Sequence, residues 1–410
     1  MRRAALLMAY IMVVWFVISF VTNLLGPLMP LLIGEYQLSL RMGGLLPFSF
    51  FLAYGLISLP AGALVERRGT RFTMLAAFAM NLAGCLAIAL HPTYPLVVSG
   101  LFVIGLGMAM LQVVINPLMR TTGGGPHFAF FSVLAQLVFG LASYVSPEVF
   151  AALMRQPALS ARPHPWVLFY QVFVAVFVLL WLVTRWLPMP RVELTAEERT
   201  GTLATYRALL RRPLVWLFFF GIIAYVGTEQ SLANWMSQFL STYHHYDPTR
   251  QGAHAVAMFW GLMALGCLLG MALLRLFDAQ RVLGAFTVLA FGCVGLALYG
   301  SAPVSLLAFP ASGFFLSVMY SVIFSLALNS LPEHHGAFSG ILCTGILGGA
   351  VVPLLVGVLG DYLGLRTALL AVFVTLGFIL SISLWARPLV RNETVSLAQL
   401  FSLRSRNAAQ

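Results

Sequence analysis

The chain consists almost entirely of apolar runs of about 20 residues, separated by short breaks that contain arginine, proline or glycine. A run of this length matches the hydrocarbon core of a bilayer, which an α-helix crosses in about 20 residues. Of the 410 residues, 60% are hydrophobic and 9% are charged, whereas an ordinary soluble domain has about 25% charged residues. We therefore expect an all-α polytopic membrane protein rather than a soluble or disordered chain.

Cutting the chain at these breaks predicts twelve membrane-spanning helices in two halves of six. The runs are 5–33, 43–64, 72–91, 95–118, 128–150, 165–187, 213–242, 252–274, 282–299, 304–331, 338–360 and 367–386. The longest polar break follows the sixth run. We therefore expect an N-terminal six-helix bundle at 1–190, a cytoplasmic linker at 191–212, a C-terminal six-helix bundle at 213–390 and a cytoplasmic tail at 391–410.

The arginines predict the orientation of these helices. All 23 basic residues are arginine, and with a cytoplasmic N-terminus eighteen of them fall on the cytoplasmic side. The five on the outer side are Arg41, Arg155, Arg162, Arg250 and Arg366. Because cytoplasmic loops of membrane proteins are enriched in Lys and Arg, we expect both termini in the cytoplasm. The net charge of +11 is then explained by topology, and no nucleic-acid partner is expected.

The loop after the second run carries a motif, GALVERRGTR at 62–71. It resembles the G-x-L-a-D-r-x-G-r signature of the major facilitator superfamily, whose members also have two halves of six helices. The resemblance implies a conformational latch in which a carboxylate pairs with arginines and helix ends. The residues concerned are Gly62, Glu66, Arg67, Gly69 and Arg71. The alternative is a positively charged turn that serves topology alone.

Polar side chains gather in the first, fourth, seventh and tenth runs. They are Thr22, Asn23, Gln112, Asn116, Thr228, Glu229, Gln230, Ser231, Asn234, Ser317, Tyr320, Ser321, Ser325 and Asn329, and the fifth run adds Gln136. Nested three-helix repeats place the first helix of each repeat around a central cavity near the bilayer midplane. The pattern therefore predicts a polar cavity between the two halves.

Glu229 is the one carboxylate well inside a predicted span. It lies sixteen residues after Pro213, or about 24 Å along a helix. An ionisable group at this depth is a candidate functional residue, here a proton carrier or a Na⁺ ligand. The alternative is a neutral, hydrogen-bonded structural residue. No phosphate-binding loop accompanies it, so we expect secondary transport without a cofactor.

Several stretches resemble the fucose, glucose and galactose symporter branch of the major facilitator superfamily. They include 22–30, 105–117, 134–136 and 323–329, and the most specific is Tyr225-Val-Gly-Thr-Glu229. The resemblance implies that Asn23 and Gln136 bind sugar. Gly26 and Gln112 depart from it, because the fucose symporter has an Asp and a Glu at the matching positions. Coupling would then depend on Glu229, through H⁺ or Na⁺, or the chain would be an uncoupled sugar uniporter.

The sequence thus predicts a sugar transporter of a bacterial inner membrane that works by alternating access, with a monosaccharide as substrate. The predicted substrate-binding residues are Asn23, Gln112, Asn116, Gln136, Asn234, Trp235 and Tyr320, with Glu229 for cation coupling. Aromatic side chains beside amides suit a sugar ring and its hydroxyls. We expect a monomer in the lipid bilayer, no metal site other than Na⁺ at Glu229, and no enzymatic activity. A drug or metabolite exporter of the same fold, or a non-transporting sensor or scaffold, are the alternatives.

Overall fold

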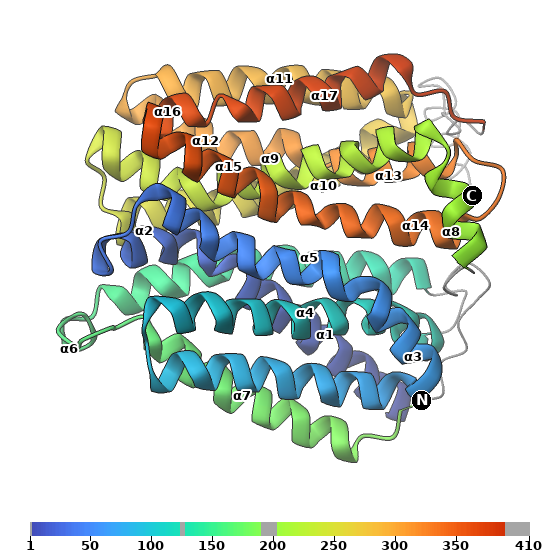
Figure 1. The fold of residues 1–410 in the computed structure, drawn as a ribbon, viewed down its shortest axis with the longest axis horizontal. Helices are drawn as coiled ribbons and strands as arrows, with labels where there is room; N and C mark the ends of the chain where they lie inside the picture. The colour runs from blue at the N-terminus through green and yellow to red at the C-terminus, as the bar shows by residue number, and fades with distance from the viewer. Residues whose placement is uncertain (1, 124–127, 190–202, 390–410) are drawn as a thin grey trace, which may run out of the picture.

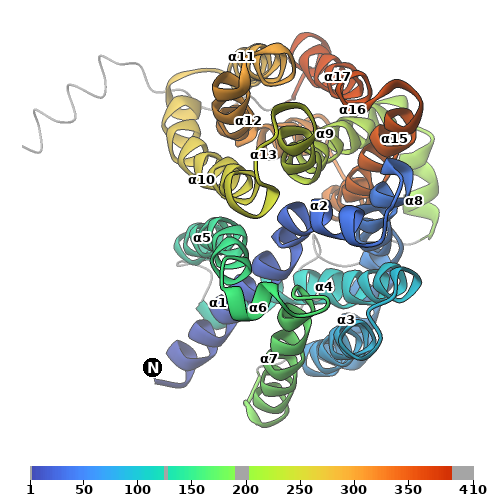
Figure 2. The same cartoon turned by 90° about the vertical axis from the view of Figure 1, so that its left-hand side faces the viewer.

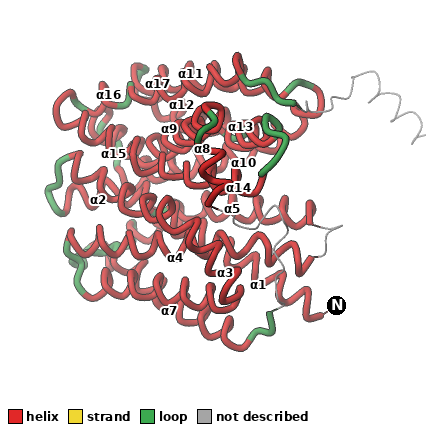
Figure 3. Tube along the Cα trace, turned by 45° about the vertical axis from the view of Figure 1, so that its right-hand side comes forward, coloured by secondary structure: helices red, strands yellow, loops and turns green. Residues whose placement is uncertain are grey.

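The structure is a computed structural model that describes residues 2–123, 128–189 and 203–389. Within these ranges the chain is helical apart from short turns and loops (Figure 3). The predicted tail at 391–410 and residues 191–202 of the predicted linker lie outside the described residues. The remainder of the linker contains the helix α8 (Leu203–Leu210), which the sequence analysis did not predict. This helix packs against the second half of the chain.

Helices of the first half precede α8. They are α1 (Arg2–Asn23), α2 (Leu25–Glu35), α3 (Leu40–Leu90), α4 (Tyr94–Gly123), α5 (Phe128–Met154), α6 (Pro157–Ser160) and α7 (Val167–Trp186). Helices of the second half follow it. They are α9 (Pro213–His244), η2 (Pro248–Gly252), α10 (Ala253–Leu276), α11 (Ala279–Tyr299), α12 (Ala302–Leu316), α13 (Met319–Leu328), α14 (His335–Thr344), η3 (Gly345–Leu347), α15 (Gly348–Leu363), α16 (Leu365–Ala368) and α17 (Ala371–Trp385).

Eleven helical segments of the described chain are long and apolar enough to cross a membrane. One of them, α3, has 51 residues and would extend about 77 Å if straight, far more than the roughly 30 Å hydrocarbon core. It is not straight, because Gly69 leaves the helical region with a φ of 83°. Most residues avoid a positive φ, whereas glycine adopts it at little cost. The chain reverses there, and its two legs lie at 40–68 and 70–90 (Figure 1).

The two halves of the chain form two groups of helices that lie side by side (Figures 1 and 2). They touch mainly where α3 packs on α15, α5 on α10 and α2 on α9. The N-terminus and α8 lie at one end of the molecule, which we call the α8 end, and α6 and α16 lie at the other, the α6 end (Figure 1).

Three of the apolar runs are interrupted well inside their length rather than forming one continuous helix each, and the twelfth is interrupted near its start, between α16 and α17. The first run divides into α1 and α2 at Leu24, and the tenth divides into α12 and α13 at Ser317 and Val318. The eleventh contains the short 3₁₀ turn η3 between α14 and α15. Interrupted helices are tolerated at membrane depth where protein or a cavity surrounds them.

Candidate functional site

A chain of hydrogen bonds runs along one side of α9 and includes Glu229. The Tyr225 hydroxyl donates to Oε1 of Glu229 at 2.7 Å, and the Gln230 amide approaches Oε2 at 3.4 Å. The Asn234 amide donates to the Gln230 carbonyl at 2.8 Å and approaches its side-chain oxygen at 3.3 Å. Residues four apart share a helix face, so Tyr225 meets Glu229 and Gln230 meets Asn234 because of their spacing, while Gln230 follows Glu229 directly and links the two pairs. Both carboxylate oxygens therefore have donors within their own helix.

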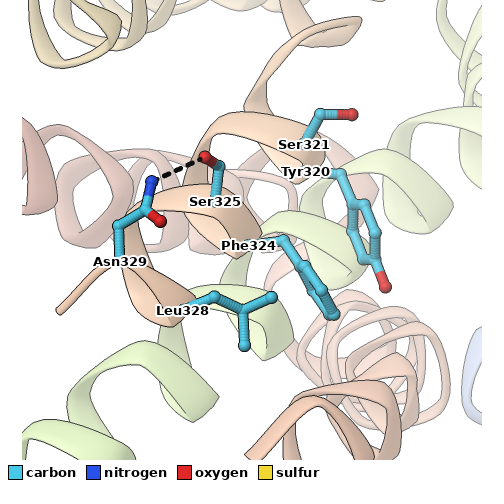
Figure 4. A pocket seen from close by; sticks show the side chains of 6 residues that line it. All are labelled: Tyr320, Ser321, Phe324, Ser325, Leu328 and Asn329. Carbon is cyan, nitrogen blue, oxygen red and sulfur yellow. Dashed lines mark hydrogen bonds between the residues drawn. The ribbon is translucent and has the colours of Figure 1, made fainter. Parts of the chain in front are cut away.

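An aromatic stack connects this chain to a cavity on α13. The Tyr225 and Tyr320 rings lie 5.8 Å apart, and Tyr320 stacks on Phe324 at 5.8 Å. The cavity has a volume of about 350 Å³ and is lined by Tyr320, Ser321, Phe324, Ser325, Leu328 and Asn329. Figure 4 shows these side chains on successive turns of α13, with the Asn329 amide directed at the Ser325 hydroxyl at 3.4 Å. All six residues belong to α13 or to its C-terminal cap, and this one helical segment offers the cavity an aromatic surface beside two hydroxyls and an amide.

The sequence prediction identified only part of this cavity, since its substrate-binding set included Tyr320 but not Ser321, Phe324, Ser325 or Asn329. The signal was available in the tenth run. Two sets of residues recur there every four positions. The polar set is Ser317, Ser321, Ser325 and Asn329, and the apolar and aromatic set is Tyr320, Phe324 and Leu328. That spacing places each set on one helix face, so the two stripes lie next to each other.

In the first half, Asn23 is buried where α1 meets α5. Its amide donates to the Ser19 carbonyl at 2.9 Å and to the Ser143 hydroxyl at 3.0 Å. Gln112 on α4 is half-buried and Gln136 on α5 is exposed, while the side chain of Asn116 lies outside the described residues. The structure therefore brings Tyr225, Glu229, Gln230, Asn234 and Tyr320 together in the second half, with Asn23 in a separate polar group.

Trp235 is also separate from the α13 cavity. It is fully buried, and its indole N–H donates to the Pro353 carbonyl at 3.0 Å. Its ring lies where side chains at Gly43 and Gly357 would otherwise point, 3.5 Å and 3.1 Å from their ideal Cβ positions. Trp235 therefore packs at the junction of α3, α9 and α15, and a role in substrate binding stays a prediction.

Gly26, one of the two departures from the fucose symporters, has a packing reason. An added Cβ would lie 2.7 Å from the Ala233 carbonyl oxygen of α9 and 3.3 Å from the side chain of Val256. Real Cβ atoms essentially never come within 3.0 Å of such an atom. In this conformation α2 thus packs too closely against α9 to accommodate an Asp at this position.

The GALVERRGTR motif occupies the reversal of α3 at the α8 end. Gly69 makes the turn, and the Arg71 guanidinium donates to the Leu187 carbonyl at the end of α7 at 2.5 Å. A cation at a helix C-terminus complements the negative end of the helix dipole. Gly62, Glu66 and Arg67 lie on the first leg, before the turn. A switching role for these five residues stays a prediction.

Comparison with known proteins identifies the family of this chain. Residues 11–346 match the model of the Major Facilitator Superfamily. The chain is 31% identical over 382 residues to a "Glucose/galactose transporter" of Brucella abortus, covering 89% of this chain and 90% of the relative. It is 24% identical over 380 residues to the "L-fucose-proton symporter" of Escherichia coli, covering 85% of this chain and 86% of the relative.

Solved structures agree on the fold. A crystal structure of the fucose:proton symporter of E. coli matches with a TM-score of 0.65 and 20% identity, over 93% of this chain and 98% of that one. A bacterial homologue of the lysosomal transporter Spinster, in an inward-facing and unoccupied conformation, matches with a TM-score of 0.76 and 15% identity, over 94% and 97%. The family match and the named relatives confirm the resemblance to sugar symporters and the expectation of a transporter rather than an enzyme. The chain belongs to the major facilitator superfamily.

Proposed function

We propose that this protein is a monosaccharide symporter that works by alternating access and uses Glu229 to carry the coupling proton. One observation carries the proposal. The Glu229 carboxylate is hydrogen-bonded by Tyr225, whose ring contacts Tyr320 in the wall of the α13 cavity. A change of charge at Glu229 therefore reaches the cavity through two side chains.

The chemistry of the cavity supports a sugar. A pyranose has an apolar C–H face and a rim of hydroxyls, which need an aromatic surface and paired polar groups. Tyr320 and Phe324 supply the first, and Ser321, Ser325 and Asn329 supply the second. Six further residues complete the proposed site when the halves close around the substrate. They are Asn23, Gln112, Asn116 and Gln136 of the first half, and Asn234 and Trp235 of the second. The relatives' names, glucose/galactose transporter and fucose-proton symporter, support both the substrate class and the proton.

We also propose twelve spans, with both termini in the cytoplasm of a bacterial cell, and a monomer in the inner membrane. The reversal at Gly69 divides α3 into two spans and so brings eleven segments to twelve. The five arginines expected outside lie near the α6 end, in the first turn of α3, beside α6, in η2 and in α16. The α6 end is therefore the proposed outer end, and the GALVERRGTR motif is a proposed latch at the cytoplasmic end.

Uptake into proteoliposomes tests the proposal. A labelled monosaccharide panel is offered with an inward proton gradient, an inward Na⁺ gradient or neither. Glu229→Gln keeps an acceptor for Tyr225 but cannot ionise. The control is Glu333→Gln, which removes an exposed carboxylate in the loop after α13.

Proton-driven accumulation that is lost in Glu229→Gln and kept in Glu333→Gln is the expected result. Accumulation driven by Na⁺ would replace the proton as the coupling ion, and downhill equilibration indifferent to both gradients would make the protein a uniporter. If no sugar is transported, thermal stabilisation by dyes or quaternary amines but not by sugars would move the function to an exporter, since a ligand stabilises the state that it binds.

A further inference from the structure

A carboxylate of one half caps a helix of the other half at the α6 end. Asp361, in the last turn of α15, accepts the backbone N–H of Leu40 on Oδ1 at 2.7 Å and that of Arg41 on Oδ2 at 3.1 Å. These N–H groups belong to the first turn of α3, where intrahelical acceptors are missing. Ser39 fills the usual capping position and accepts from Met42 at 3.3 Å. Asp361 thus adds a second cap from across the interface between the halves.

Because of its position in α15, the charged Asp361 carboxylate is stabilised only while it contacts α3. A helix C-terminus carries partial negative charge, so the last turn of α15 disfavours an anion, whereas the first turn of α3 favours one. If the halves separate at this end, the carboxylate loses both donors and keeps the unfavourable helix end. The first turn of α3 loses two acceptors at the same time. Both consequences favour the closed arrangement.

Close packing of the two backbones beneath the cap holds it in register. The Leu40 carbonyl oxygen lies 2.5 Å from the ideal Cβ position of Gly357, and the Pro353 carbonyl oxygen lies 3.2 Å from that of Gly44. At Gly357 only glycine leaves room for such an approach, and at Gly44 a side chain would force its neighbour to shift slightly. The first leg of α3 and α15 therefore touch directly, and the distance from Asp361 to the α3 terminus is set by backbone contact.

A second polar contact closes the opposite flank of the same end. His254 at the start of α10 pairs with Glu148 near the end of α5. Figure 2 looks onto the α6 end and shows α5 beside α10 on one flank, with α3 and α15 on the other. The cap by Asp361 and the pair of His254 with Glu148 are thus polar contacts between the halves on opposite flanks of the interface.

We propose that Asp361 is a positioning residue of the transport cycle, which latches the outer end shut by capping α3 across the halves. The latch must release each time the outer end opens to substrate. This inference rests on the proposed function for its place in a transport cycle, but the contact itself is independent of which solute is carried.

The test uses the full chain in lipid nanodiscs, spin-labelled at Ser160→Cys beside α5 and at Thr367→Cys on α16. Both labels are introduced into a variant whose four native cysteines are replaced. This variant must retain solute flux or, if no flux is measurable, the thermal stability of the parent. Double electron–electron resonance then measures the distance between the two spin labels, and so between the halves at the α6 end. Asp361→Asn removes the charge while keeping the shape, and Asp361→Ala removes both. The matched control is Asp247→Asn, because Asp247 caps η2 within its own half, accepting from Thr249 at 2.8 Å.

We expect a rise of about two- to fivefold in the ratio of long to short distances in both Asp361 variants. Asp247→Asn should leave the distribution unchanged. Parental distributions in a folded, monodisperse Asp361→Asn protein would overturn the latch, as would an equal shift in Asp247→Asn. A shift in a protein that transports no sugar would uphold the latch and reject the proposed substrate, so the two failures are distinguishable.

Discussion

Glu229 and Tyr225, which donates a hydrogen bond to it, lie where their spacing along the chain predicts. A carboxylate inside an apolar run is visible in the sequence, and Tyr225 four residues before it shares its helix face. Trp235 was less predictable. It lies only six residues beyond Glu229, but its indole donates to Pro353 on α15. Whether an aromatic residue faces a cavity or a neighbouring helix depends on packing between distant segments, which helical spacing alone does not contain.

The hydroxyl lining of the α13 cavity leads to a prediction for Ser325. Ser325→Ala removes one hydroxyl that the substrate is proposed to bind, so the KM for uptake should rise about two- to tenfold with little change in kcat, as for the loss of one neutral hydrogen bond. Concentration-dependent uptake of the transported sugar measures this.

The control for this change is Ser330→Ala, five residues along the same segment. Its hydroxyl is buried and donates to the Leu326 carbonyl at 2.6 Å, and it does not line the cavity. Equal KM values for the parent and Ser325→Ala would remove Ser325 from the substrate site. Equal increases in the two variants would point to a general disturbance of α13.

At the scale of the helices, apolar patterning predicted where the chain crosses the membrane but not where a crossing is broken. The first run divides at Leu24, an apolar residue that continues the pattern, and the tenth divides at Ser317 and Val318. Hydrophobicity reports partition into lipid, whereas a break depends on how neighbouring helices approach. Gly26, just after the first break, shows this, since its lack of a side chain is explained only by the Ala233 carbonyl of α9.

Gly26→Ala should therefore destabilise the observed packing of α2 on α9. Overpacking of this kind typically costs about 1–3 kcal/mol, so the melting temperature of the purified protein should fall. The matched control is Gly34→Ala in the same helix, where a Cβ meets nothing within 4 Å. Because alanine favours helix over glycine by up to about 1 kcal/mol, Gly34→Ala should match or exceed the parent. Tryptophan fluorescence during heating measures the melting temperatures of the parent and of both variants. Equal melting temperatures for the two variants would contradict the close approach of α2 to α9.

For the whole molecule, two properties of the sequence predicted the arrangement of helices. The lengths of the apolar runs predicted an all-helical membrane protein, which is confirmed, and the longest polar break predicts a division into two bundles, which stays a prediction. The structure adds which surfaces of the two halves meet, with α3 on α15 and α5 on α10. That pairing depends on small residues and polar contacts far apart in the chain, such as Gly44 with Pro353 and Asp361 with Leu40. No local pattern records such pairs.

The proposed topology yields a labelling prediction. Cysteines are introduced at Ser160 in α6 and at Ala208 in α8, on a background without the four native cysteines. A membrane-impermeant maleimide should label Ser160→Cys in cells with a permeabilised outer membrane, and Ala208→Cys only after the inner membrane is disrupted. The reason is that α7 is the one candidate span among the described residues between the two sites, and that most arginines of the described chain fall at the α8 end.

Each other outcome of this labelling contradicts a particular step. Labelling of both sites in intact cells would mean that α7 does not cross the membrane, although its 20 residues are long and apolar enough to do so. The reversed pattern would place the α6 end in the cytoplasm. The contact between Asp361 and α3 would then close the inner rather than the outer entrance, and the five arginines of that end would lie on the side where arginine is common, leaving the other eighteen outside against the usual bias.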